Sequence, residues 1–300
     1  MNMKDIPEPI PAATLILIRP HGNRFQVYLL KRSPKSRFLP NVYVFPGGTL
    51  EPEDYGLARW ETHLDLDANR LEEVLGGRGL SAEAVLPYSV AAVRETFEEA
   101  GVWLAQKNGA KNYHLEALQK LRKNEALTSS WFLETVQKQG WILNLSRMRR
   151  WSHWITPIGL PFRFDTRFYL TCMPDEQVCL PDMKETVAGI WVPPKEALEG
   201  GCNGDIPLSP PILATLQELL AFGSFNELVA AADRREWGES LMPRLVTLER
   251  GNVILEPWDP LYHEVQPQLK PPAESDVLPP QTSFSRIWHD GRIWRPVRIT

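Results

Sequence analysis

The hydrophobic positions at the start of the chain follow the clustering that is typical of short β-strands. Residues 12–18 and 25–31 are apolar runs rich in β-branched, aliphatic and aromatic side chains, and the turn-forming residues 20–23 separate them. This arrangement predicts a hairpin. Residues 42–45 form a third short apolar run, which ends at residues 46–48 (Pro-Gly-Gly). Because glycine adopts backbone conformations that other residues avoid, we expect this strand to end in a tight turn.

Helical periodicity replaces this pattern further along the chain. Val90, Val93 and Phe97 recur at spacings of three and four, which places them on one face of a helix that packs against a core. Ser89 is a suitable N-cap and Gly101 a suitable C-terminal stop. We therefore expect a helix between these two residues, with carboxylates on its opposite face.

The rest of the chain mixes helical and strand-like segments. Residues 55–86 are acidic and helix-prone, and Asp290-Gly291 between aromatic flanks predicts a C-terminal hairpin. Further helices are expected near residues 114–123, 128–139, 209–222 and 224–233, and further strands at residues 151–155, 164–171 and 187–192. This interleaving, without an internal repeat, indicates the α/β class.

The composition indicates a globular protein. The chain has 300 residues, of which 43% are hydrophobic and 23% charged, so it is long enough for a sizeable core and unlike disordered or coiled-coil proteins. Its formal net charge of -4 excludes the basic surface of a general nucleic-acid binder. The 27 prolines and 11 tryptophans are unusually many.

The sequence shows neither a targeting segment nor a disulfide framework. The first ten residues mix charges with prolines, and the apolar run at residues 12–18 is far shorter than the ~20 residues that cross a bilayer. The three cysteines, Cys172, Cys179 and Cys202, form no CxxC pair. We therefore expect a soluble, cytoplasmic protein with free thiols and no membrane partner. The sequence leaves the oligomeric state open.

Three glutamates on the predicted helix are the strongest chemical signal. Glu95, Glu98 and Glu99 stand at positions i, i+3 and i+4, so they share one helix face within a single turn. Like charges this close repel each other. An all-oxygen cluster favours a hard divalent ion such as Mg²⁺ or Mn²⁺, which in turn favours phosphate substrates. Taken alone, the pattern also fits an ordinary solvated acidic helix face.

The surroundings of these glutamates resemble the signature of the Nudix hydrolase family. The motif Arg-Glu-x-x-Glu-Glu-x-Gly runs from Arg94 to Gly101, and Gly48 is followed six positions later by Asp54, where glutamate is usual. The family pattern then allows seven residues before the arginine, whereas residues 55–93 number 39, so 32 are extra. The resemblance therefore implies a Nudix box that is interrupted by an insertion, not degraded.

A box interrupted at this point is similar to that of one branch of the family, the coenzyme A diphosphatases of the nudix motif-19 type. The segments that match this branch are residues 29–33, 37–40, 44–48, 152–157 and 164–169. The resemblance implies an α/β/α Nudix sandwich with a mixed β-sheet, helical insertions and a C-terminal appendage. We expect a Nudix domain over residues 1–255, with the insertion at about 55–86, and a proline-rich tail over residues 256–300.

The resemblance also implies roles for the residues of the box. Those that would hold Mg²⁺ or Mn²⁺ are the backbone carbonyl of Gly47 and the carboxylates of Glu95, Glu98 and Glu99, of which Glu98 and Glu99 would be catalytic. Those with a structural role would be Gly48, Asp54, Arg94 and Gly101, with Arg94 paired to an acidic residue of the box. Water would attack phosphorus in a nucleoside diphosphate derivative. Coenzyme A or acyl-coenzyme A would give 3′,5′-ADP and 4′-phosphopantetheine or its acyl form.

Further assignments lie outside the box. Nudix enzymes often recruit an additional glutamate as general base, and Glu185 is our candidate, with a solvated surface charge as the alternative. The side chains that could grip the 3′-phosphate of coenzyme A are Arg32, Ser33, Lys35 and Arg37, with a solvated loop as the alternative. Ser33 and Arg37 fit the pattern of coenzyme A-active members, whereas Asn41 replaces a glycine of that pattern. His153 is expected to be structural.

Two other functions stay open at this point. The Ser-Gln-Pro-Trp-Pro-Phe-Pro string of NADH-cleaving members and the proline of ADP-ribose members are missing, so coenzyme A is favoured over ADP-ribose or a dinucleotide. A Nudix-fold binding or regulatory protein without catalysis is the second alternative, which the three retained glutamates disfavour. The expected partner is a nucleotide-type small molecule.

Overall fold

A computed structural model describes residues 6–77, 79–107, 115–123 and 128–298 of the chain. Within these residues the centre is a mixed sheet of seven strands, five of which follow the order β3-β2-β1-β8-β7. These five are β1 (Ile10–His21), β2 (Arg24–Arg32), β3 (Tyr43–Val44), β7 (Arg149–Ile155) and β8 (Phe164–Cys172). The other two are β4 (Gly47–Thr49), which pairs with β1, and β9 (Thr186–Val192), which pairs with β2.

Strand β1 lies at the centre of this sheet and pairs with β2, β4 and β8. It forms the predicted hairpin with β2, with Ile18 opposite Val27, and it runs parallel to β8, with Ala13 opposite Arg167. At its start it also pairs with β4, where Ala13 lies opposite Gly48. Gly47 and Gly48, for which the sequence predicts a tight turn, are therefore strand residues, because pairing with β1 attaches them to the centre of the sheet.

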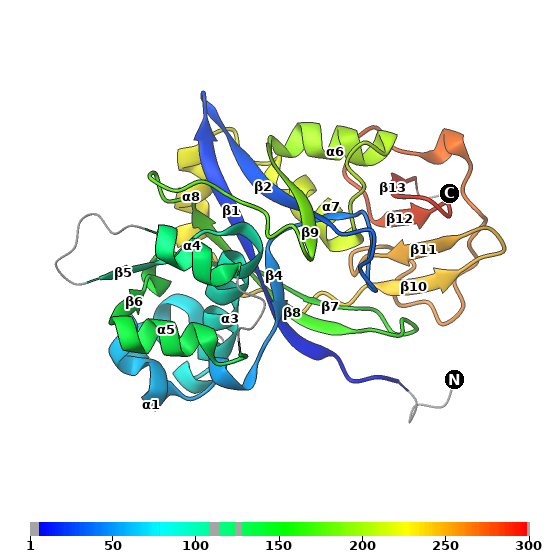
Figure 1. Cartoon of the computed structure of the whole chain (residues 1–300). Coiled ribbons are helices and arrows are strands. Elements are labelled where there is room, and N and C mark those ends of the chain that lie inside the picture. Colours follow the sequence, from blue (N-terminus) through cyan, green and yellow to red (C-terminus); the bar gives the residue numbers. More distant parts are fainter. Residues whose placement is uncertain (1–5, 78, 108–114, 124–127, 299–300) are drawn as a thin grey trace.

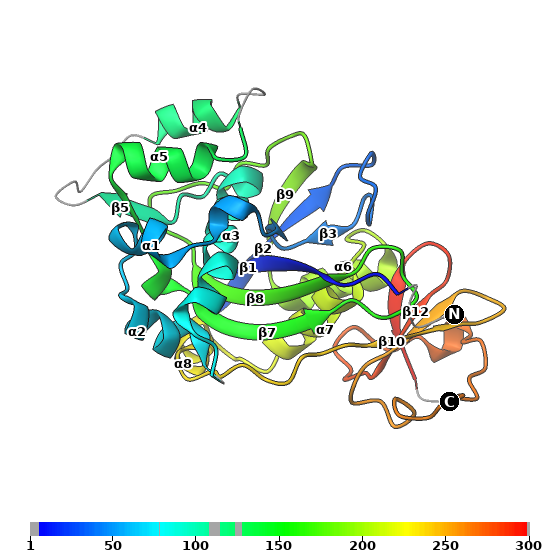
Figure 2. The same cartoon turned by 90° about the horizontal axis from the view of Figure 1, so that it is seen from below.

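Side chains of the sheet alternate between two cores, because neighbouring strand residues point to opposite faces. On β1, Leu15 and Leu17 face the first core, whereas Ile16 and Ile18 face the second. The helices over the first core include α3 (Ala82–Ala100), α4 (Glu116–Arg122) and α5 (Trp131–Gln139), and those over the second are α6 (Pro194–Asn203), α7 (Pro210–Leu219) and α8 (Phe225–Asp233). Figures 1 and 2 show these two layers. The predicted α/β/α sandwich is confirmed.

Helix α3 begins earlier than the sequence predicts. We expected Ser89 as the N-cap, but the helix starts at Ala82 and its N-cap is Ser81. Ser89 lies inside the helix, where its hydroxyl donates to the Val85 carbonyl oxygen, 3.0 Å away. Pro87 lacks the N–H that a helix interior uses, yet the helix continues through it. Burial of Val85 in the core stabilises these first turns, which local sequence rules treat as a break.

The insertion at residues 55–86 forms short helices that join the first core. Its elements are α1 (Leu57–Trp60), a 3-10 turn (Glu61–His63), α2 (Ala68–Leu71), a π-helical turn (Glu72–Gly76) and the beginning of α3. Trp60, Leu71 and Leu75 are fully buried. The inserted segment is therefore part of the hydrophobic core and not a flap on its surface.

The remaining elements largely follow the prediction. Strands β7, β8 and β9 and helices α5, α7 and α8 lie where they are expected, and α4 matches the helix near residues 114–123, of which residue 114 lies outside the described part. Strands β5 (Ala105–Lys107) and β6 (Trp141–Leu143) form a small antiparallel pair. Helix α6 is unexpected, because Pro193-Pro194 suggests a break. Pro194 occupies its first helical position, where the missing N–H is not needed.

The C-terminal part of the chain forms a second, antiparallel sheet, at the right of Figure 1. Its strands in order are β10 (Arg244–Thr247), β11 (Asn252–Leu255), β12 (Arg286–His289) and β13 (Trp294–Val297). The hairpin predicted at Asp290-Gly291 joins β12 to β13. The boundary predicted between residues 255 and 256 falls inside this sheet, since β11 pairs with β12. Throughout the described residues, no helix is long and apolar enough to cross a membrane.

Candidate active site

Two glycines bring strand β4 close to helix α3 and strand β1. A Cβ atom on Gly48 would stand 2.4 Å from Cδ of Glu95, and a Cβ atom on Gly47 would stand 2.4 Å from the Ala13 carbonyl oxygen. Both distances are too short for real atoms, so these positions need glycine for the close approach of the backbone. Strand β4 therefore lies directly against the helix that carries the three glutamates.

The backbone of Gly47 binds Glu99. The Gly47 N–H donates to Oε2 of Glu99 over 2.9 Å, and Glu99 is only 4% exposed. Burial, followed by the nearby charge of Glu95, raises the pKa of Glu99 well above its usual value, although the hydrogen bond from Gly47 opposes the shift. The family resemblance implies a role for the Gly47 carbonyl, whereas the contact in the structure is made by the Gly47 N–H.

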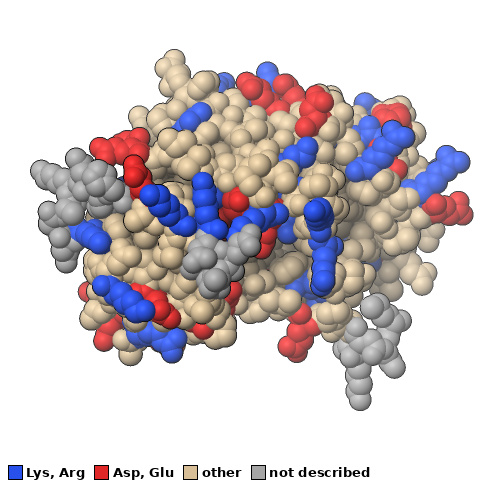
Figure 3. Space-filling view, in the orientation of Figure 1, with Lys and Arg blue, Asp and Glu red and all other residues tan. Residues whose placement is uncertain are grey.

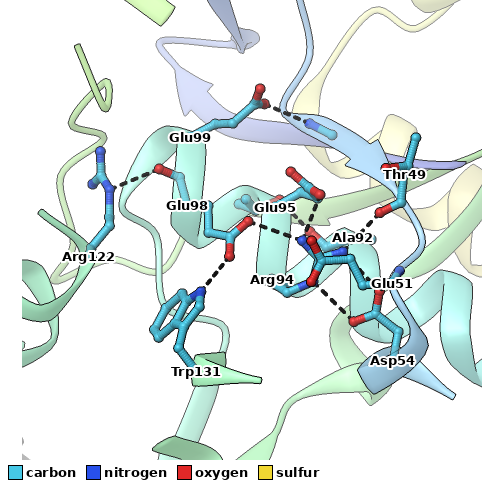
Figure 4. A network of polar contacts seen from close by, with 12 residues as sticks. Thr49, Glu51, Asp54, Ala92, Arg94, Glu95, Glu98, Glu99, Arg122 and Trp131 are labelled. Carbon is cyan, nitrogen blue, oxygen red and sulfur yellow. Dashed lines mark hydrogen bonds and ion pairs between the residues drawn. The ribbon is translucent and has the colours of Figure 1, made fainter. Parts of the chain in front are cut away.

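Arg94 is the cation at the centre of the cluster (Figure 4). Its Nε donates to Oδ1 of Asp54 over 3.1 Å and its Nη2 donates to Oδ2 over 2.9 Å, with both side chains almost fully buried. Nη1 donates to Oε1 of Glu95 over 2.7 Å and to Oε2 of Glu98 over 3.1 Å. Nη2 also donates to the Thr49 carbonyl oxygen. The acidic residue of the box that pairs with Arg94 is thus Asp54.

Negative charge in this cluster is incompletely balanced. Three carboxylates, those of Asp54, Glu95 and Glu98, contact the single guanidinium of Arg94, and the carboxylate of Glu99 is directed to Gly47 instead. Burial raises the pKa of Glu95 to about 8 and also raises that of Glu98, while Arg94 opposes both shifts. A cation bound beside these carboxylates would favour their ionised forms.

The donor set suits a hard divalent cation, since carboxylate oxygens are the ligands that Mg²⁺ and Mn²⁺ prefer. In the described part of the chain, no three Asp, Glu, His or Cys side chains converge in a way that could hold a metal ion. The reason is that Glu95 and Glu98 face Arg94, whereas Glu99 faces Gly47. Each carboxylate oxygen accepts at two sites, so these contacts leave acceptor capacity for a cation.

Residues beyond the box hold the end of α3. Gly101 ends the helix in a left-handed conformation with φ 71°, and a Cβ atom there would collide with Nη1 of Arg122. Arg122 Nε donates to the Glu98 carbonyl oxygen over 3.0 Å, and Nη2 donates to the Leu180 carbonyl oxygen over 2.6 Å. The last carbonyls of a helix have no partner within it, so these bonds fix the turn that carries Glu98 and Glu99.

Sequence reasoning missed both Arg122 and Trp131. The indole Nε1 of Trp131 donates to Oε1 of Glu98 over 2.7 Å (Figure 4). The two residues follow Glu98 by 24 and 33 positions, on α4 and α5. No motif marks either helix, and their patterns indicate only a buried face, so the contact with the site is visible in the fold alone.

The loop after β2 carries the predicted substrate-binding residues. Arg32 turns into the loop, where its Nε donates to the Phe38 carbonyl oxygen over 3.1 Å. Ser33 is buried, whereas Lys35 and Arg37 are exposed. Figure 3 shows Lys and Arg side chains spread across the middle of the face on which β4 and β9 lie in Figure 1. The loop thus combines one arginine that shapes its backbone with two cations open to solvent.

Asn41, which stands where the family resemblance implies a glycine, has an uncommon backbone conformation. Its φ is 61°, in the left-handed region, which glycine adopts freely and asparagine more readily than other side chains. Asparagine is therefore a suitable residue for this position of the loop that carries Ser33 and Arg37.

Glu185 lies on the Glu99 side of the site. Its carbonyl oxygen accepts from the Ser33 N–H over 2.7 Å, and its charge is among the causes that raise the pKa of the buried Glu99, after burial and Glu95. Asp182 fixes this segment: its N–H donates to the Glu99 carbonyl oxygen over 3.1 Å, and its carboxylate accepts from the Glu185 N–H over 2.9 Å. The side chain of Glu185 is exposed.

His153 lies on β7, apart from this cluster. Its Nε2 is 2.5 Å from Oδ1 of Asp165 on the neighbouring strand β8. Among the described residues it makes no hydrogen bond to the carboxylates of α3. The contact links two strands of the sheet, and the structural role expected for His153 stays a prediction.

Several known proteins are similar to this chain. The family model for the NUDT19 Nudix domain matches residues 9–219. The acyl-coenzyme A diphosphatase NUDT19 of Xenopus laevis is 32% identical over 309 residues, covering 92% of this chain and 81% of that protein. The Homo sapiens protein of the same name is 29% identical, covering 82% and 74%. A solved NUDIX hydrolase from Alicyclobacillus acidocaldarius shares the fold, with a TM-score of 0.60, 24% identity and coverage of 77% and 98%.

Proposed function

Because the chain belongs to the Nudix hydrolase family, with a NUDT19-type Nudix domain, we propose that it hydrolyses the diphosphate bond of coenzyme A or acyl-coenzyme A. The products are 3′,5′-ADP and 4′-phosphopantetheine, or its acylated form. The observation that carries the proposal is the ion pair of Arg94 with Asp54, which closes the box across the insertion. The names of the two NUDT19 relatives support the choice of substrate.

Nudix hydrolases generally use divalent metal ions, and we assign such an ion to the three glutamates of α3. In this proposal Glu95, Glu98 and Glu99 bind Mg²⁺ or Mn²⁺ beside the Gly47 backbone. When bound, the ion neutralises charge on the phosphate oxygens and lowers the pKa of the attacking water. The raised pKa of Glu95, caused chiefly by burial, supports the assignment, because a cation offsets the unfavourable ionisation of a desolvated carboxylate.

Glu185 accepts the proton of the attacking water. The water oxygen bonds to phosphorus while the bond from phosphorus to the bridging oxygen breaks, and the bridging oxygen leaves with the departing phosphate. The position of Glu185 supports this role, since Ser33 and Asp182 hold its backbone next to Glu99. Arg94 acts differently, because its donors are directed to protein oxygens. It therefore orients carboxylates and does not bind substrate.

The basic loop after β2 binds the 3′-phosphate of coenzyme A. Arg37 is exposed, and its guanidinium makes no hydrogen bond or ion pair with another described residue, so it is available for a charge-assisted bond to phosphate. Lys35 is exposed in the same loop. Arg32 and Ser33 contribute through the loop backbone, which they fix by bonds to Phe38 and Glu185.

Hydrolysis assays on a panel of substrates test the proposal. The protein is incubated with Mg²⁺ and coenzyme A, an acyl-coenzyme A, ADP-ribose or NADH, and the products are separated by liquid chromatography. We expect 3′,5′-ADP from coenzyme A or its ester and its loss in Glu98→Gln. The control Glu116→Gln changes an exposed glutamate of α4 and should keep the wild-type rate.

Two other results would contradict the proposal. Cleavage of ADP-ribose or NADH without cleavage of coenzyme A compounds would assign a different nucleotide substrate. Full activity of Glu98→Gln would show that the Glu98 carboxylate on α3 is not needed for catalysis.

A further inference from the structure

The indole of Trp131 contacts one of the proposed metal ligands. Its Nε1–H donates to Oε1 of Glu98 over 2.7 Å, and the side chain is 8% exposed. An indole has a single hydrogen-bond donor, and Trp131 directs it to this carboxylate. The other oxygen of Glu98, Oε2, accepts from Nη1 of Arg94 over 3.1 Å. Glu98 is therefore held from two sides.

The indole itself is fixed by its neighbours. Its ring centroid lies 5.9 Å from that of Phe97, the residue before Glu98, and 5.7 Å from that of Phe132. Two positions before Trp131, Ser129 Oγ donates to Oε1 of Glu53 over 3.1 Å, beside the box residue Asp54. The start of α5 thus contacts both halves of the interrupted box. Packing against Phe97 and Phe132 fixes the position of the indole, and its hydrogen bond then fixes the position of the Glu98 carboxylate.

Two fixed donors determine the orientation of the Glu98 carboxylate. A carboxylate has about four acceptor sites on its two oxygens, so acceptor capacity remains on each oxygen beside the bonds from Trp131 and Arg94. Rotation of the carboxylate toward another direction would break one of these charge-assisted bonds. The bonds from Trp131 and Arg94 therefore fix the direction in which the remaining acceptor sites of the Glu98 carboxylate point.

We propose that Trp131 is a positioning residue of the metal site: its indole N–H holds Glu98 in the orientation in which the carboxylate binds the divalent cation. This inference rests on the proposed function. It adds a residue outside the Nudix box, 33 positions after Glu98, to those that set the metal affinity. Removing a hydrogen-bond partner of a metal ligand typically weakens metal binding by about 10- to 100-fold.

Trp103 provides a matched control in the same aromatic cluster. It is 1% exposed, and its ring centroid lies 4.8 Å from that of Phe97. Its Nε1 has no hydrogen-bond partner among the described residues. Trp→Phe substitutions at positions 103 and 131 therefore remove the same atoms from one cluster, but the substitution at 131 alone removes a bond to Glu98.

Mn²⁺ binding in the absence of substrate tests the proposal directly. The free ion is measured by electron paramagnetic resonance for the wild-type protein, Trp131→Phe and Trp103→Phe, and thermal unfolding shows that each variant is folded. We expect Trp131→Phe to bind Mn²⁺ about 10- to 100-fold more weakly, and Trp103→Phe to bind it as the wild type does. Unchanged affinity in Trp131→Phe, or equal weakening in both variants, would overturn the proposal.

Glu98→Ala separates this inference from the proposed function. If Trp131 acts through Glu98, then Trp131→Phe causes no further loss of Mn²⁺ affinity in the Glu98→Ala background. If Glu98→Ala binds Mn²⁺ as tightly as the wild type, the metal assignment itself is wrong. If Glu98→Ala weakens binding and Trp131→Phe does not, only the role of Trp131 is wrong.

A measurement on the wild-type protein covers the case in which Trp131→Phe does not fold. In protein with isotope-labelled tryptophan, saturating Mg²⁺ should shift the Nε1–H resonance of Trp131, because its acceptor carboxylate binds the ion. The Nε1–H resonance of Trp103 should shift less. An unshifted Trp131 resonance would contradict the proposal.

Discussion

Arg94 and Asp54 form a buried ion pair with two hydrogen bonds of 3.1 and 2.9 Å, although they stand 40 positions apart in the sequence. The same guanidinium also contacts Glu95 and Glu98. One arginine thus joins the part of the box before the insertion to the glutamates after it. Removing one partner of a buried pair leaves a charge without compensation, which typically costs about 3–5 kcal/mol.

Asp54→Asn should therefore destabilise the protein, by roughly 3 kcal/mol. We expect the lower end of that range because Glu95 and Glu98 still contact Arg94 in the variant. Urea denaturation measures the change in the free energy of unfolding. Glu61→Gln changes an exposed residue of the insertion and should stay within about 0.5 kcal/mol of the wild type. Equal stability of the two variants would contradict a structural role for the pair.

Gly48→Ala should lower activity while the protein stays folded. The added methyl group would stand 2.4–2.6 Å from the carboxylate atoms of Glu95, so the carboxylate must move. A displacement of about 1 Å at a catalytic group can lower the rate by about 100-fold. The control is Gly238→Ala, where a Cβ atom meets nothing within 4 Å. Steady-state kinetics compare the two, and wild-type activity in Gly48→Ala would disprove the importance of this contact.

Glu185→Gln should lower kcat by about 10²- to 10⁴-fold, the usual contribution of a general base, with little change in KM. Gln keeps the size of the side chain but cannot accept the proton of water at neutral pH. Glu176→Gln alters another exposed glutamate of the same β8–β9 loop and should leave the rate unchanged. If both variants behave alike, the base lies elsewhere and Glu185 is a solvated surface charge.

Glu256 should make the protein less stable as the pH rises. Its side chain is fully buried, neither carboxylate oxygen has a hydrogen-bond partner among the described residues, and burial raises its pKa to about 8. The folded protein therefore holds this proton more tightly than the unfolded chain, whose pKa is near 4.5. The stabilisation is complete below pH 4.5 and is lost progressively as the pH rises toward about 8.

Glu256→Met removes the titrating group and keeps an apolar side chain of similar size. Unfolding measured at pH 5.5 and pH 9 should show a smaller difference for this variant than for the wild type. Glu249→Gln, an exposed residue in the turn between β10 and β11, should retain the wild-type difference. An equal pH dependence in all three proteins would show that Glu256 does not bind a proton on folding.

The strands and the box helix could be predicted because their signals are local. A continuous apolar run marks β1, which is buried on both faces, and the spacing of Glu95, Glu98 and Glu99 depends on the helical repeat alone. The start of α3 could not be predicted in this way. Ser81 and Ser89 are both suitable N-caps, and Pro87 favours a start at Ser89. The helix nevertheless starts after Ser81, because its first turns are buried in the core.

The contacts of Trp131, Arg122 and Asp182 with the glutamates were beyond prediction. Each residue lies on a segment far from the box in sequence, and its position depends on how that segment packs against α3. The Asp54 partner of Arg94 was within reach, because the family resemblance defines the acidic position six residues after Gly48. Long-range contacts were therefore predictable where a motif linked the two ends, and not where packing alone brings them together.

The insertion that divides the box adds only a small entropic cost of loop closure to the free energy of folding. The free energy of closing a loop rises only with the logarithm of its length, so the change from seven to 39 intervening residues adds about 1.5 kcal/mol. Burial of a side chain such as Leu71 or Leu75 contributes about 1.5–3 kcal/mol and offsets this closure term. A catalytic motif can therefore accept a new segment during evolution without losing its geometry, provided that both ends return to the same contact. Deleting the segment from this protein would remove Trp60, which is fully buried in the first core, and would leave a cavity that destabilises the fold.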